Sequence, residues 1–236
     1  MKSIGVRIDK LKRRKLFLKI LRIVLLVLTL ILLISYVVMR IIYNNGNFSI
    51  TLDKNLYFEK GLIIYDDPEY KVFRQELYAG SIEYFDNISY KWLPKNLDQG
   101  KGSHNGKNYL AYTFYIENTG TDVTDYYYEI IIDDVIKNVD EAIRVRLYKN
   151  GVETTYAKLG ANGKAEKNTT PFESDEVIAL VHNEDFAPTA IDRYTVVMWL
   201  EGSDPDCTDN ILGGEIKIHM DFNSEITEPG VKQEEE

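Results

Sequence analysis

Cysteine is almost absent from this 236-residue sequence, which contains only Cys207. A single thiol excludes a disulfide within the chain and a metal centre built from several cysteines. The neighbouring carboxylates of Asp206 and Asp209 would raise the pKa of this thiol, so we do not expect Cys207 to act as a nucleophile. A folded domain must therefore depend on its hydrophobic core, which a chain of this length can bury.

Histidine is also scarce, and the three residues of this type are His104, His182 and His219. They lie far apart in the sequence, whereas a hydrolytic zinc site usually places two histidines on one helical face. The sequence contains no G-x-S-x-G motif, no phosphate-binding loop and no dinucleotide fingerprint. We therefore predict that the chain is not an enzyme and holds no catalytic cofactor.

Acidic residues are nearly absent from the first 43 positions, which carry ten Lys and Arg residues against Asp9 alone, a net charge of +9. The rest of the chain has the opposite balance, with a net charge of −18. Nucleic-acid binding by this acidic part is not expected, because the electrostatic attraction to phosphate would have the wrong sign. The basic end is suited to anionic lipid.

Residues 23–39 form an apolar run without a charged residue, and about 24 positions, 20–43, are apolar apart from Arg22 and Arg40. This length predicts a transmembrane helix, with the two arginines reaching the headgroups. The basic cluster Lys10–Lys19 places the N-terminus in the cytoplasm. A cleaved signal peptide is the alternative, but the run is long and small residues of a cleavage site do not follow it. We predict a cytoplasmic tip at 1–19 and an uncleaved signal anchor at 20–43.

Alternation of apolar and polar residues dominates the region from residue 44 to 222, and it predicts strands with one buried face. The segments with this pattern are Leu110–Ile116, Ile143–Tyr148, Tyr194–Leu200 and Glu215–Phe222. Asn150-Gly151 between two such segments indicates a hairpin, and Val135–Ala142 is the one stretch that looks helical. The prediction is an all-β, antiparallel β-sandwich of jelly-roll or Ig-like type at 44–222, followed by a disordered acidic tail at 223–236.

One acidic segment, Glu201–Asn210, carries several oxygen ligands of the kind that calcium prefers. The candidate ligands are Glu201, Asp204, Asp206, Asp209 and Asn210. The spacing lacks the glycine and the final glutamate of an EF-hand loop. The alternative is an acidic, solvated turn between two strands.

Tyrosine is abundant, with 17 residues, and three are consecutive at positions 126–128. In a strand, Tyr127 would lie on one face and Tyr126 and Tyr128 on the other. Together with Tyr109 and Tyr115 they could form an aromatic strip for a partner or a glycan. The alternative is that they pack in the core with their hydroxyl groups at its rim.

The chain resembles the TasA/camelysin-like exported proteins of Firmicutes in three stretches and their order. These stretches are Tyr112–Gly120 with the tyrosine-rich strand after it, Lys137–Val145, and the Trp199–Cys207 loop that leads through Gly213-Gly214 to a last strand. The resemblance implies an exported jelly-roll domain, and members of the family build biofilm-matrix fibres by donating a strand between subunits. Camelysin is a surface metalloprotease, but no motif of this chain carries that activity over. Family members usually have a cleavable signal, from which the retained helix of this chain departs.

These observations predict a single-pass protein of a bacterial cell membrane with its large domain outside. Its partners would be membrane lipid through residues 20–43 and a protein partner or a second copy at the cell surface. The leading functional hypothesis is a structural or interaction module that assembles with or tethers matrix fibres, with Phe48–Leu52 as a strand that another subunit could accept. The alternative is a calcium-stabilised adhesion or binding domain, and a surface metalloprotease comes third.

Overall fold

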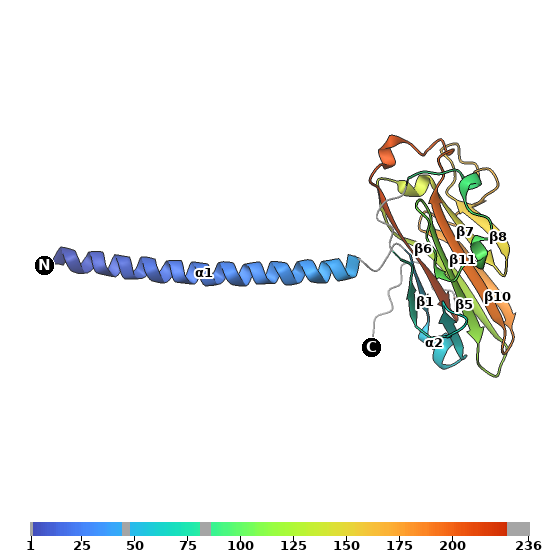
Figure 1. Cartoon of the computed structure of the whole chain (residues 1–236), viewed down its shortest axis with the longest axis horizontal. Helices are drawn as coiled ribbons and strands as arrows, with labels where there is room; N and C mark the ends of the chain where they lie inside the picture. The colour runs from blue at the N-terminus through green and yellow to red at the C-terminus, as the bar shows by residue number, and fades with distance from the viewer. Residues whose placement is uncertain (1, 44–47, 81–85, 226–236) are drawn as a thin grey trace. The chain divides into compact units, whose positions relative to one another are not determined.

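The computed structural model describes residues 2–43, 48–80 and 86–225, and the chain divides into two compact units, Met1–Asn45 and Gly46–Glu236. The first unit is a helix, α1 (Lys2–Tyr43), drawn in blue in Figure 1. Within it, the 24 residues Lys15–Val38 are long and apolar enough to cross a membrane, and their side chains are exposed. The prediction that this segment is helical is confirmed. Its apolar run contains no proline or glycine that would interrupt the helical hydrogen bonds. The predicted tail at 223–236 lies, from residue 226 on, outside the described residues.

The second unit consists of two β-sheets joined by loops (Figure 1). The five-stranded sheet has the order β10 (Val177–Phe186), β6 (Thr124–Ile136), β12 (Glu215–Asn223), β1 (Phe48–Leu52) and β3 (Glu76–Tyr78). The other sheet has the order β2 (Leu62–Tyr65), β5 (Leu110–Asn118), β11 (Ile191–Leu200), β7 (Ile143–Lys149), β8 (Val152–Ala157) and β9 (Thr170–Pro171), with β4 (Gly102–Ser103) beside β5. Short helical elements lie in the loops: α2 (Lys54–Phe58), η1 (Tyr90–Trp92), η2 (Leu97–Gln99), η3 (Val139–Glu141) and η4 (Asp209–Ile211).

The alternating segments form strands where the sequence predicts them. In β7, the predicted inner residues Ile143, Val145 and Leu147 are all buried. The hairpin between β7 and β8 turns at Asn150 and Gly151, whose φ angles of 52° and 85° fit a two-residue turn of the type that Asn-Gly favours. The prediction of a β-rich domain is therefore confirmed, and the jelly-roll or Ig-like type stays a prediction.

The inner faces of the two sheets share one hydrophobic core. Phe222 on β12 lies at its centre, because its ring contacts Phe114 on β5 and Tyr194 on β11 in the opposite sheet, at centroid distances of 5.8 and 5.5 Å. Tyr126 on β6 also contacts Phe222 and donates or accepts a 2.8 Å hydrogen bond with the hydroxyl of Tyr194. Aromatic packing between the sheets thus joins strands that are distant in sequence.

Two strand pairs differ from the antiparallel prediction. β1 runs parallel to β12 and antiparallel to β3, and β8 runs parallel to β9. A parallel neighbour needs a long connection, and nearly the whole domain lies between β1 and β12 in the sequence. Alternation alone gives the faces of a strand but not its direction.

The helical prediction for Val135–Ala142 is largely wrong. Val135 and Ile136 continue strand β6, and only Val139–Glu141 form a short 3₁₀ turn. The reason is local, since Lys137 and Asn138 have positive φ angles of 60° and 53°, which a right-handed helix does not allow.

Candidate functional site

The acidic segment Glu201–Asn210 follows β11 directly and is held against a loop from a distant part of the chain. The backbone of Glu201 donates a 2.9 Å hydrogen bond to the carbonyl oxygen of Ala142, and Ile88 donates one of 2.9 Å to Leu200. Ile88 and Trp199 belong to a second, smaller hydrophobic cluster, which covers the outer face of β5 and β11. The segment is therefore part of a packed layer over this sheet.

The carboxylate of Glu201 is buried and accepts hydrogen bonds from protein donors. Oε2 accepts from the indole Nε1 of Trp199 at 3.0 Å and from the backbone nitrogen of Tyr90 at 2.9 Å, while Oε1 accepts from the Ser203 hydroxyl at 2.6 Å. Burial alone would raise the pKa of Glu201, but these donors outweigh burial and lower it. Glu201 thus acts as an ionised anchor for the loop.

Asp204 is buried as well, and its partner is Arg144 on β7. The guanidinium of Arg144 donates to Oδ2 of Asp204, with both side chains at most 5% exposed, and it also donates to the carbonyl oxygen of Ile143 at 3.1 Å. The other carboxylate oxygen of Asp204 accepts from the backbone of Asp206 at 2.8 Å. This buried ion pair fastens the loop to the outer face of the sheet.

The remaining predicted ligands lie further out. Asp206 is partly exposed, whereas Asp209 and Asn210 are exposed in η4. Among the described residues, which omit 1, 44–47, 81–85 and 226–236, no three His, Cys, Asp or Glu side chains are arranged to hold a metal ion. The structure therefore does not bring the five predicted ligands to one point, and calcium binding stays a prediction.

Cys207 lies in the same loop and is partly buried. Burial raises the pKa of its thiol, and the nearby charge of Asp204 adds to this effect. The expected direction is correct, but the carboxylates that contribute are Asp204 and Glu201 and not the predicted Asp206 and Asp209.

The three histidines lie in separate surroundings. The ring nitrogens of His104 contact the carbonyl oxygens of Gly102 and Leu97 at 2.9 and 3.0 Å, which fixes this loop. His182 on β10 stacks on Tyr127 with ring centroids 4.2 Å apart. His219 on β12 lies between two carboxylates, with its ring nitrogens 2.7 Å from Asp133 and 3.3 Å from Asp221.

The proposed aromatic strip does not form. Tyr126 and Tyr128 are buried in the core, while Tyr127 points outward, so the face assignment is confirmed. Tyr115 stacks on Tyr65 with centroids 5.4 Å apart, and Tyr109 packs against the smaller hydrophobic cluster.

The sequence did not identify Asp192 as a buried carboxylate at the edge of the core. It accepts hydrogen bonds from the Tyr126 hydroxyl at 2.5 Å and from the Asn150 side chain at 2.7 Å, and the Lys149 ammonium lies 3.2 Å away. A charged residue at the start of an apolar strand gave no sign of this role, because its partners come from β6, from the end of β7 and from the turn that follows β7.

Comparisons with known proteins place the chain in no family. No family model and no curated protein matches it. Two crystal structures of the β-glucosidase from Kluyveromyces marxianus, one of them with glucose, match at 11% and 9% identity over 70% of this chain, each with a TM-score of 0.24. The matched region spans only 15% and 16% of those chains, and a likeness this weak carries no argument about fold or activity.

Proposed function

We propose that this chain is a membrane-anchored structural or interaction module, with its β-sheet unit displayed outside a bacterial cell. The observation that carries the proposal is helix α1, in which residues 23–38 carry no charged side chain on any face, next in sequence to a β-sheet unit that has its own core. A helix with no polar face is stable in lipid and not in water.

The orientation is tested by cysteine labelling, which is simple because the chain has a single native cysteine. In a Cys207→Ser background, Ala161→Cys places a thiol in an exposed turn of the β-sheet unit, and Ser3→Cys places one at the basic end. A membrane-impermeant maleimide added to intact cells should label the Ala161→Cys variant and leave the Ser3→Cys variant unlabelled until the cells are lysed. Labelling of only the Ser3→Cys variant would refute the proposed topology.

A non-catalytic role is supported by how the chemically reactive side chains are used. Glu201 and Asp204 accept hydrogen bonds from protein groups, and burial and Asp204 keep the Cys207 thiol protonated. In the described residues the histidines lie apart from one another: a ring nitrogen of His104 contacts a backbone carbonyl, and His182 stacks on a tyrosine ring. A surface metalloprotease therefore stays the least favoured hypothesis.

Assembly into matrix fibres, as the resemblance to TasA/camelysin-like proteins implies, would require strand exchange. In this structure Phe48–Leu52 is β1, which is hydrogen-bonded on both sides, to β12 and to β3. Exchange would therefore begin with β1 leaving its own sheet, which would open a slot for the same strand of a second copy.

A reversible lock tests this assembly. Ser49 and Tyr78 are paired across β1 and β3, so Ser49→Cys with Tyr78→Cys in the Cys207→Ser background would fix β1 in place by a disulfide. The oxidised protein should stay monomeric, and the reduced protein should self-associate like the Cys207→Ser control. Equal self-association of the oxidised and reduced forms would refute exchange of β1.

The second candidate, a calcium-stabilised adhesion domain, is favoured by the outward position of Asp206, Asp209 and Asn210. A cation that binds only the folded state must raise the melting temperature. Melts with calcium and with a chelator should differ if this candidate is correct, and Asp209→Asn should remove the difference. Identical melts would rule it out.

A further inference from the structure

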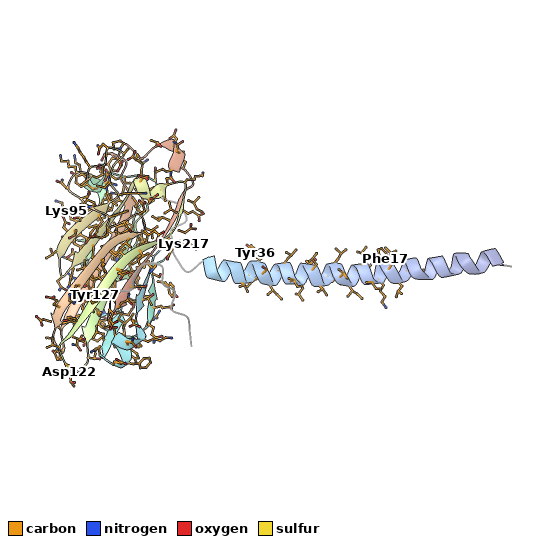
Figure 2. All side chains as sticks on the ribbon, turned by 180° about the vertical axis from the view of Figure 1, so that it is seen from behind. Phe17, Tyr36, Lys95, Asp122, Tyr127 and Lys217 are labelled. Carbon is orange, nitrogen blue, oxygen red and sulfur yellow. The ribbon has the colours of Figure 1, made fainter. Side chains whose placement is uncertain are left out.

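The outer face of the five-stranded sheet, the side turned away from the shared core, is rich in carboxylate groups. Strands β6, β12 and β1 each direct alternate residues away from the core, and Tyr127 and Lys217, labelled in Figure 2, lie on two of these strands. The carboxylates on or beside this face are Glu76, Asp125, Glu129, Asp133, Glu184 and Asp221. Such a face repels anions and attracts cations.

Glu129 lies in the middle of this face, and it is the least satisfied of these carboxylates. It is only 4% exposed, and its Oε1 is a buried oxygen with no hydrogen-bond partner among the described residues. The strand register places it directly between Leu180 on β10 and Asp221 on β12. A buried acceptor without a donor is costly, and two carboxylates opposite each other repel.

The groups around Glu129 relieve this repulsion only in part. Burial raises the pKa of Glu129, the charge of Asp221 raises it further, and His219 lowers it. His219 lies 2.7 Å from Asp133 through Nδ1 and 3.3 Å from Asp221 through Nε2, so it is shared between these two. Asp133 therefore competes with the Glu129–Asp221 pair for the His219 cation, and Oε1 of Glu129 is left without a donor.

An aromatic pair lies one step along the same strands. Tyr127 and His182 are register partners on β6 and β10, and their stacked rings are two positions from Glu129 and Leu180. Aromatic faces attract ammonium and guanidinium groups. Within the Glu129–Asp221 pair, Asp221 is the carboxylate that an incoming cation would meet first, because its side chain is 29% exposed and Glu129 is 4% exposed.

We propose that this outer face, which we call the acidic sheet face, binds a basic polypeptide segment, with a lysine or arginine side chain seated at Glu129 and Asp221. The argument is charge complementarity together with one buried carboxylate oxygen that lacks a donor. The proposal names the partner chemistry of the interaction module and rests on that proposed function. It does not depend on strand exchange, since the partner would contact the face of the sheet and would not pair with an edge strand.

The test uses the full chain in detergent micelles at pH 7 and a fluorescently labelled peptide of ten lysines, with a peptide of ten glutamines as the neutral control. Fluorescence anisotropy gives the Kd. The variant Glu129→Gln with Asp221→Asn keeps the shapes of both side chains and removes their charge. It should weaken decalysine binding at least about tenfold, because the seated cation loses both charged partners.

A matched control separates this site from the general negative charge of the domain. Glu59→Gln with Glu173→Gln removes the same charge from two exposed positions outside the acidic sheet face, and it should change the Kd less than about threefold. A thermal melt of each variant shows whether it is folded. An equal effect of the two double variants would overturn the proposal, and so would unchanged binding by the Glu129→Gln, Asp221→Asn protein, which would mean that Glu129 binds only a proton. Either failure leaves the cysteine-labelling result, and with it the proposed topology, unaffected.

Discussion

The buried ion pair between Arg144 and Asp204 allows a quantitative prediction about the loop that follows β11. Replacing Arg144 by methionine keeps most of the side-chain volume but leaves Asp204, whose side chain is 1% exposed, without a counter-charge. Glu166, whose carboxylate is 3.8 Å from the Arg144 guanidinium, would lose the same cation, and as an anion it cannot neutralise Asp204. The variant therefore creates a buried, uncompensated carboxylate.

The expected cost is about 3–5 kcal/mol of unfolding free energy, the range for removing one member of a buried pair. A second variant, Arg144→Met with Asp204→Leu, removes both charges and should recover most of the loss, since a well-packed apolar pair is often as stable as the ion pair it replaces. A third, Lys101→Met, breaks the exposed pair with Glu69 and should leave stability unchanged.

Urea unfolding of the full chain in detergent micelles measures all three variants, followed by the fluorescence of buried Trp199 in a background in which the exposed Trp92 is replaced by phenylalanine. Trp199 is a suitable reporter because its indole donates to Glu201 in the same loop. If the single Arg144 variant cost less than about 1 kcal/mol, the pair would not be shielded from water, and the reasoning from burial would be wrong. A double variant as unstable as the single one would show that shape and not charge explains the loss.

Three further predictions concern the core, a turn and a titrating group. Tyr126→Phe removes the hydroxyl that Asp192 accepts from, and it should cost about 1–3 kcal/mol in the same urea assay, with no change at neighbouring exposed Asp125→Asn. Gly151→Ala should cost about 1–2 kcal/mol, because φ is 85° there although space is open, and a hydrogen-exchange measurement should show the loss at the β7–β8 hairpin. Burial would lower the pKa of His219, but Asp221 and Asp133 outweigh it and raise the pKa above its ordinary value of 6.5. The folded state then favours the protonated form, so its contribution to the free energy of unfolding is complete below pH 6.5 and is lost as the pH rises through the folded-state pKa. Between pH 6 and 8.5 the free energy of unfolding should therefore fall with rising pH, and His219→Gln should remove this dependence. The same dependence in the variant would contradict the assignment.

The sequence predicts the strands well, because side-chain alternation and burial have the same physical origin. Of the predicted inner residues of β12, Ile218, Met220 and Phe222 are buried and Ile216 is partly buried, and the Asn150-Gly151 turn joins β7 and β8 as expected. The parallel pairing of β1 with β12 was not predictable in this way. Pairing depends on which strand edges meet after the chain has returned across the domain, and no local pattern records that.

The acidic loop shows why candidate ligands are harder to predict than strands. Glu201 and Asp204 have the residue types of a cation site, yet Trp199, Ser203 and Arg144 supply their donors from within the protein. One sign was present in the sequence: Val197 and Trp199 are apolar at positions of β11 that alternation assigns to solvent. Both faces of that strand had to be covered, and this indicates that the segment directly after it packs over the sheet.

Glu129 presents the converse case, and it shows what a sequence cannot reveal about charge. In the segment from Tyr126 to Ile132 it is one polar residue on an outward position, as ordinary as any surface glutamate. Only the register of β6 with β12 places it opposite Asp221 and leaves its Oε1 without a donor. The same residue type is satisfied at Glu201, by Trp199, Ser203 and the backbone of Tyr90, and unsatisfied at Glu129, so the difference depends on the donors that the fold brings to each carboxylate. The hydrogen-bonded carboxylates of Glu201 and Asp204 thus hold the acidic loop, whereas the donor missing at Glu129 is what the proposal for the acidic sheet face rests on.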